Sequence, residues 1–145
     1  MRFLIDTNVF LHAANSASPF HQSARSFLDE HVQNGTSWCT TWPIVYEFLR
    51  VSTHGRVFPK PLKAKQALAF LEPLLALEEV TVLVETDRHF HLLERTTEEL
   101  SHPAGNLFHD IHTATLMREY GIREIVTADT DFLQFGFLTV LNPLR

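Results

Sequence analysis

The chain has 145 residues, of which 45% are hydrophobic, and this size and composition predict one compact domain spanning residues 1–145. Its single cysteine, Cys39, excludes an internal disulfide, and no apolar stretch is long enough to span a membrane, so we expect a cytoplasmic protein. The formal net charge of -5 would repel a polyanion over most of the surface, so any nucleic acid would have to be bound locally or through a metal ion.

Short apolar runs alternate along the chain with segments whose apolar residues recur at helical spacing. The short runs predict strands and the helical spacing predicts helices, with glycine and proline marking the ends of both. In chain order we expect a strand at 2–5 ending in a polar turn, a helix at 20–32, a strand at 37–41, a helix entered at Pro43, a helix over 62–77 kinked or split at Pro73, a strand at 80–84, helices at 87–100 and 107–120, a strand from Glu124 with Asp129 at its tip, and a last strand at 137–141.

Strands that alternate with helices predict an α/β fold, a three-layer α/β/α sandwich around a mainly parallel central sheet. In such a sheet the functional crevice lies beyond the carboxyl ends of the strands. Asp6 and Asp129 each follow an apolar run directly, so we expect both at the same edge of the sheet. An aspartate at this position can also serve only to cap the next helix, and the sequence leaves both interpretations open.

Two further acids, Glu47 and Asp110, interrupt otherwise apolar helical stretches. A solvated helix face is the alternative explanation, and it suits Asp110 better than Glu47. If these two converge with the strand-tip acids, each like-charge pair at ~4 Å costs about 4 kcal/mol at an effective dielectric of 20. Bound Mg²⁺ or Mn²⁺, which prefers carboxylate oxygens, would relieve this repulsion and could activate water for attack on a phosphodiester.

The same acids, in this order, carry a family resemblance. The chain resembles the PIN-domain nucleases over essentially its whole length, and it looks most like the VapC toxins of bacterial VapBC toxin–antitoxin pairs. The residues that carry it are Phe-Leu-Ile-Asp6-Thr7-Asn8, Glu47 in the helix beginning near Pro43, Asp110 in His-Asp-Ile-His-Thr-Ala, and Thr127-Ala-Asp129-Thr-Asp131-Phe132.

This resemblance implies a PIN-like fold, an endoribonuclease that depends on Mg²⁺ or Mn²⁺, a homodimer, and inhibition by a small cognate VapB-like antitoxin. It implies that a quartet of acids binds the metal and catalyses hydrolysis, namely Asp6, Glu47, Asp110 and Asp129. Supporting residues are implied at Thr7, Asn8, Thr127 and Asp131, and whether Asp129 or Asp131 is the closer ligand stays open. The chain departs from the pattern in its nine histidines, of which His109 and His112 flank Asp110; we expect them to be exposed or to orient ligands.

Three other functions compete with this one. His109-Asp110 also occurs in HD-type metal phosphohydrolases, but those proteins are all-helical, and residues 80–84 are a poor helix. A non-catalytic receiver-like module would need an acidic pair after the first strand and a late lysine, whereas no lysine follows Lys65. A silent, antitoxin-binding member of the family would lack one acid of the quartet. The densest basic run either lines an RNA path or forms a solvated surface; its members are Arg50, Arg56, Lys60, Lys63 and Lys65.

Overall fold

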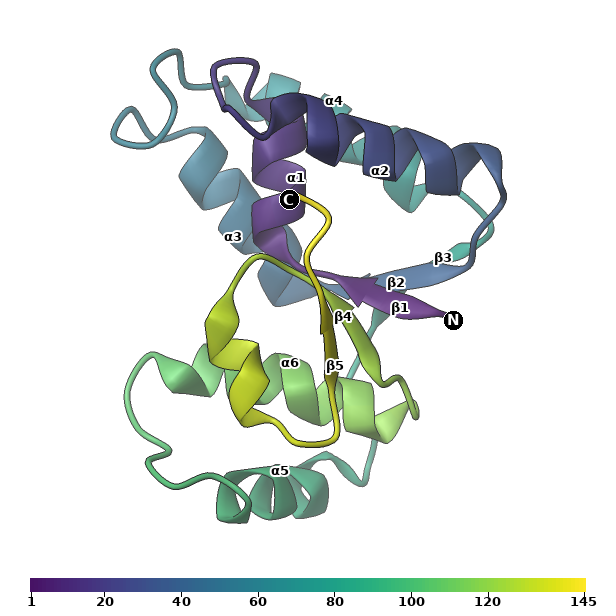
Figure 1. Ribbon diagram of the computed structural model, residues 1–145, viewed down its shortest axis with the longest axis vertical. Helices are drawn as coiled ribbons and strands as arrows, with labels where there is room; N and C mark the ends of the chain where they lie inside the picture. Colours follow the sequence, from purple (N-terminus) through teal and green to yellow (C-terminus); the bar gives the residue numbers. More distant parts are fainter.

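The computed structural model describes residues 1–145 and is built on a five-stranded sheet of order β3-β2-β1-β4-β5. All four strand pairings are parallel. Helices α1 to α4 lie on one face of the sheet, and α5 and α6 lie on the other (Figure 1), which confirms the three-layer α/β/α architecture. The elements are β1 (Phe3–Ile5), α1 (Thr7–Ala14), α2 (His21–Gln33), β2 (Trp38–Thr41), α3 (Trp42–Ser52), α4 (Ala64–Leu75), β3 (Val80–Leu83), α5 (His89–Glu98), α6 (Leu107–Glu119), β4 (Glu124–Val126), the 3₁₀ helix η1 (Thr130–Gln134) and β5 (Thr139–Leu141).

The strand order changes direction between β1 and β4. From β1 the chain adds β2 and then β3 on one side, and α5 and α6 carry it back across the sheet to β4 on the other side. Because crossovers between parallel strands are right-handed, reversing the direction moves the connecting helices to the opposite face. The gap between the carboxyl ends of β1 and β4 is therefore the topological switch point, where open α/β sheets form their functional crevice.

The central strands and α6, which carry the residues at the switch point, are largely buried. β1 is buried along its whole length, and Ile125 and Val126 of β4 are fully buried. On the other face, α6 is buried from Thr113 to Met117, since it lies between the sheet and α5. Gly121, with φ of +69°, ends this helix in the left-handed conformation that glycine adopts without strain.

Two expectations about secondary structure were wrong. The polar turn expected after the first strand is the start of α1, whose buried face consists of Val9, Phe10 and Ala13. Helix α4 is not split at Pro73: the proline lies in the last turn, and the helix ends two residues later at Leu75. No helix of the chain combines the length and the apolar character needed to cross a membrane.

Candidate functional site

Asp6 lies at the switch point and joins β1 to β4. Its backbone N–H donates to the carbonyl of Val126 at 3.0 Å. Its Oδ1 caps α1 by accepting from the N–H of Thr7 at 2.8 Å, and its Oδ2 accepts from Thr127 Oγ1 at 2.8 Å and from Asn8 Nδ2 at 3.2 Å. Burial raises the pKa of Asp6, and these hydrogen bonds oppose the rise. The carboxylate is therefore fixed in one orientation.

Thr127 and Asn8 hold the two strand ends together. The buried Thr127 hydroxyl donates to Asp6 and accepts from Asn8 Nδ2 at 2.8 Å and from the N–H of Asp129 at 3.0 Å. Asn8 Oδ1 in turn accepts from the N–H of Ala128 at 3.0 Å. The structure thus brings these predicted supporting residues into one network with Asp6, whereas Thr7 turns its hydroxyl toward the carbonyl of Ile44 in α3, at 3.5 Å.

Three more aspartates complete an acidic group. Carboxylate oxygens of Asp110, Asp129 and Asp131 lie within 4.8 Å of one another. Burial, and then the negative charges of Asp129, Asp6 and Asp131, raise the pKa of Asp110 to about 7. None of these four aspartates forms a salt bridge. We call Asp6, Asp110, Asp129 and Asp131 the aspartate group.

The geometry of Asp129 is compatible with both roles that the sequence left open. Its Oδ1 accepts from the N–H of Asp131 at 2.9 Å and so caps η1, while its Oδ2 makes no hydrogen bond. Asp6 likewise caps α1 and still faces the other acids. Capping and ligand binding are therefore compatible, because each role uses a different lone pair of the carboxylate.

Glu47, the fourth predicted acid, lies outside the aspartate group. Its carboxylate is bound by Arg50, whose Nη2 and Nε donate to Oε1 at 2.6 Å and to Oε2 at 3.0 Å. The hydrogen bonds from Arg50 hold the pKa of Glu47 below its usual value, and the charge of His109 acts in the same direction. The structure therefore pairs the carboxylate of Glu47 with Arg50 and does not include it in the cluster of aspartate oxygens.

The two histidines that flank Asp110 do not hydrogen-bond to it. His109 lies near Glu47, and His112 Nε2 lies 2.6 Å from Glu85 Oε1. Glu85 and its neighbour His89 were not singled out from the sequence; the richness in histidine was the only sign of them, because their partners come from distant segments.

The aspartate group fits a hard divalent cation. It offers only carboxylate oxygens, and no basic side chain neutralises it. Mg²⁺ and Mn²⁺ prefer such oxygen ligands, and a divalent charge would offset the repulsion that raises the pKa of Asp110. The residues present therefore suit the cation that the sequence predicted.

The raised pKa of Asp110 makes the stability of the metal-free protein depend on pH. Since the folded-state pKa of about 7 lies above the ordinary 3.8, the folded protein holds this proton more tightly than the unfolded chain. In EDTA, stability should therefore fall as pH rises from about 4 to 7, by about 2 kcal/mol once solvent screening is allowed for. Thermal unfolding across this range should show a smaller loss for Asp110→Asn; an equal loss would contradict the assignment.

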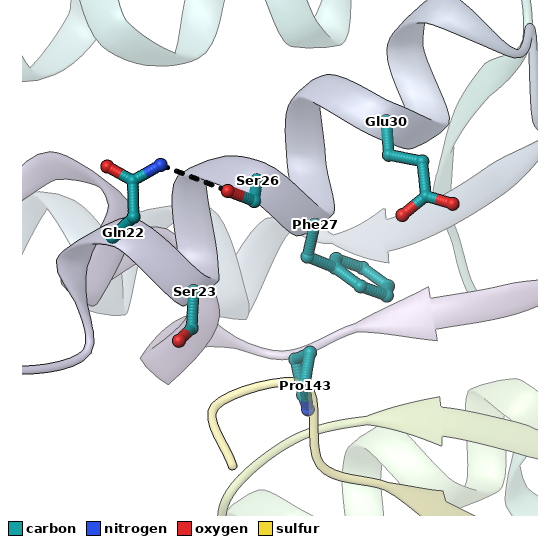
Figure 2. Close-up of a pocket in the computed structure, with 6 residues that line it drawn as sticks. All are labelled: Gln22, Ser23, Ser26, Phe27, Glu30 and Pro143. Atoms are coloured by element: carbon teal, nitrogen blue, oxygen red, sulfur yellow. Dashed lines mark hydrogen bonds between the residues drawn. The ribbon is translucent and has the colours of Figure 1, made fainter.

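A shallow pocket elsewhere does not compete with this site. It lies between α2 and the C-terminal segment, has a volume of about 400 Å³, and is lined by Gln22, Ser23, Ser26, Phe27, Glu30 and Pro143 (Figure 2). Gln22 Nε2 donates to Ser26 Oγ at 3.1 Å within it. The pocket is lined by one acid, no histidine and no basic residue, so it has neither the set of metal ligands nor the positive charge expected of a metal-dependent nuclease site.

The fold and the acids can be compared with known proteins. The family model of the PIN domain matches residues 3–138. The chain belongs to the PIN-domain family. It is 30% identical over 138 residues to the ribonuclease VapC48 of Mycobacterium tuberculosis (strain H37Rv), covering 95% of this chain and 94% of the relative. The resemblance stated from the sequence is thus confirmed.

Two solved structures support the PIN fold. The VapBC2 structure from Rickettsia felis, bound to a DNA fragment from its promoter, superposes with a TM-score of 0.70 at 18% identity and covers 98% of both chains. Mycobacterium tuberculosis VapC20, a toxin that cleaves the sarcin–ricin loop, gives a TM-score of 0.64 at 21% identity and covers 97% of this chain and 99% of its own. At these identities the likeness concerns the fold alone.

Proposed function

We propose that this PIN-domain protein is a VapC-type endoribonuclease, the toxin of a toxin–antitoxin pair, which hydrolyses RNA in the cytoplasm with Mg²⁺ or Mn²⁺. The observation that carries the proposal is the aspartate group at the switch point. Carboxylate oxygens of Asp110, Asp129 and Asp131 cluster there, the charge of Asp6 acts on Asp110, and no basic side chain forms a salt bridge with any of them. The ribonuclease VapC48, 30% identical over nearly the whole chain, supports the substrate class.

Each residue of the site has a distinct proposed role. Asp6, Asp110, Asp129 and Asp131 would hold the cation, which supplies charge neutralisation and a water of lowered pKa when bound. Thr127 and Asn8 orient Asp6 through the hydrogen bonds described above. No serine or cysteine is among the hydrogen-bond partners of these aspartates, and we propose that water attacks the phosphodiester without a covalent intermediate. Glu47 would take part once Arg50 is drawn away.

The protein must bind RNA although its formal net charge is -5. The basic run of Arg50 to Lys65 follows the Glu47 helix through the loop between α3 and α4 into the first turn of α4, and most of its side chains are exposed. Arg50 contacts Glu47, and the cationic side chains that follow it along the chain would contact the phosphates on one side of the scissile bond. We propose this surface as the RNA path.

The partner surface is apolar and lies on the same helices. Trp42 and Tyr46 of α3 and Leu68 of α4 are 48%, 68% and 53% exposed, and a pocket of about 370 Å³ is lined by Tyr46, Leu49, Arg50, Thr53, Ala64 and Leu68. We propose that an apolar helix of the cognate antitoxin docks here. Because Arg50 lines the pocket and binds Glu47, such a partner would act on the site directly.

Metal removal tests the proposed reaction. Purified protein should cleave a labelled stem–loop RNA with Mg²⁺ or Mn²⁺, lose cleavage in EDTA and regain it when the cation is restored, leaving 5′-phosphate ends. The variant Asp87→Asn, at an exposed acid outside the site, should cleave like the wild type and so controls for loss of charge. Cleavage that persists in EDTA would overturn the metal mechanism.

A further inference from the structure

A second group of metal-ligand side chains lies on the other side of α6. Ligand atoms of Glu85, after β3, His89 of α5 and His112 of α6 lie within 4.8 Å of one another. His112 follows Asp110 by two residues, which places the two side chains about 200° apart around the helix. This His–Glu cluster, Glu85, His89 and His112, is therefore separate from the aspartate group.

A buried carboxylate fixes the orientation of one of these histidines. The side chain of Glu119 has 0% exposure, and its Oε2 lies 2.7 Å from Nδ1 of His89. Its Oε1 accepts from both the N–H and the hydroxyl of Thr86, at 2.9 and 2.6 Å. Glu119 is thus fully engaged, and it holds the proton of His89 on Nδ1. In the neutral imidazole, the other ring nitrogen, Nε2, is then a free electron-pair donor.

The two imidazoles have the spacing that a shared metal requires. Their ring centroids lie 5.5 Å apart, and the rings are nearly perpendicular, at 89°. A zinc ion bound through one nitrogen lies about 3.2 Å from the ring centroid, so a tetrahedral angle separates two such centroids by ~5 Å. Glu85 Oε1 already lies 2.6 Å from His112 Nε2, and these two atoms need to separate by less than about 1 Å to take a cation between them.

We propose that the His–Glu cluster binds one zinc-class divalent ion through Glu85, Nε2 of His89 and Nε2 of His112, with Glu119 orienting His89. Two imidazoles and one carboxylate are a ligand set for Zn²⁺, whereas the oxygen-only aspartate group suits Mg²⁺ or Mn²⁺. A carboxylate on the far nitrogen of a ligating histidine is the usual arrangement around protein-bound zinc. The ion would replace the hydrogen bond between Glu85 and His112.

Such an ion would tie the end of β3 to α5 and α6. It would stabilise the helix that carries Asp110 without contacting the aspartate group, so the site acts on positioning and stability rather than on hydrolysis. The proposal stands on the contacts of the His–Glu cluster and does not depend on the ribonuclease activity.

Cobalt spectroscopy of the full chain separates the two sites. With excess Mg²⁺ occupying the aspartate group, one equivalent of Co²⁺ should give the intense visible bands of a four-coordinate site with nitrogen ligands, and Zn²⁺ should displace it. Zn²⁺ should also raise the thermal midpoint. His112→Gln and Glu85→Gln should each weaken Co²⁺ binding at least ~100-fold, and Glu119→Gln roughly 10-fold to 100-fold. His91→Gln, on an exposed histidine of the same α5, should bind Co²⁺ like the wild type.

Several results would overturn the proposal. These are the absence of the intense bands, binding that survives in both His112→Gln and Glu85→Gln, or binding that is lost in Asp129→Asn, which would place the ion in the aspartate group. Glu85 is largely exposed, with 49% of its side chain accessible, so Glu85→Gln keeps the test valid if a histidine variant fails to fold. Bands that vanish in Glu85→Gln and persist in Asp129→Asn support the site.

Discussion

Asp6→Asn should lower kcat/KM for RNA cleavage by about a thousandfold or more, which corresponds to ~4 kcal/mol of transition-state stabilisation. The substitution removes the charge at the junction of β1 and β4 while keeping the shape of the side chain. Asparagine caps helices as well as aspartate does, so the bond from the N–H of Thr7 should survive. The amide of the variant would face Asn8 Nδ2, which also donates, and we expect a stability loss of only about 1 kcal/mol.

The comparison needs a fold control and a charge control. Circular dichroism and thermal unfolding should show that Asp6→Asn is folded, and Asp87→Asn should retain wild-type kcat/KM because that acid is exposed and lies outside the aspartate group. If Asp6→Asn keeps cleavage within tenfold of the wild type, Asp6 serves only as the cap of α1.

The strand-tip acids could be found from the sequence because two rules act together. An apolar run predicts a buried strand, and parallel strands bring their carboxyl ends to one edge. Asp6 and Asp129 follow such runs directly, and the structure places both at the switch point. The order of strands and helices fixed the fold class in the same way, and the family resemblance agreed with it.

The positions of the acids on helices were harder to predict, because helical spacing does not determine which neighbour a long side chain contacts. Glu47 has three flexible torsions and an arginine at i+3, a spacing at which the two side chains meet. Arg50 binds the carboxylate of Glu47 in the structure. Asp131, for which the sequence left open a supporting role or a ligand role, lies within the aspartate group. The sequence shows that Arg50 is three residues after Glu47, but it does not show that Glu47 pairs with Arg50 in preference to joining the aspartates.

Two features could not be read from local patterns. Helix α1 begins with Thr7 and Asn8, which resemble a turn because both are polar. Their side chains instead hydrogen-bond to Ile44 of α3 and to the residues that follow β4. The His–Glu cluster draws on the end of β3, on α5 and on α6. Its members are separated along the chain, and only the packing of α5 against α6 brings them together.

The position of α6 connects the two proposed metal sites. One side of the helix presents Asp110 to the strand ends, and the other presents His112 to α5 and the end of β3. Since α6 is buried along most of its length, close packing restricts its movement between the two proposed metal sites. An ion in the His–Glu cluster would therefore limit how far Asp110 can move when RNA or a second cation enters.

Asp129→Asn should lower kcat/KM by about a hundredfold or more, and Asp131→Asn by only about tenfold. Asp129 is half-buried, and the Thr127 hydroxyl and the N–H of Asp131 fix its position. Asp131 is exposed in the first turn of η1, so its side chain must lose rotamer freedom to reach a cation. A ligand held in place before the cation arrives contributes more to its binding than one that must be ordered.

The Mg²⁺ dependence of cleavage distinguishes a direct ligand from a supporting acid. For Asp129→Asn the loss should persist at saturating Mg²⁺, because the geometry of the bound cation changes, whereas for Asp131→Asn raised Mg²⁺ should recover most of the activity. If both residues acted only through their charge, raised Mg²⁺ would recover activity in both variants. An equal or larger loss in Asp131→Asn would make Asp131 the metal ligand and leave Asp129 as the cap of η1.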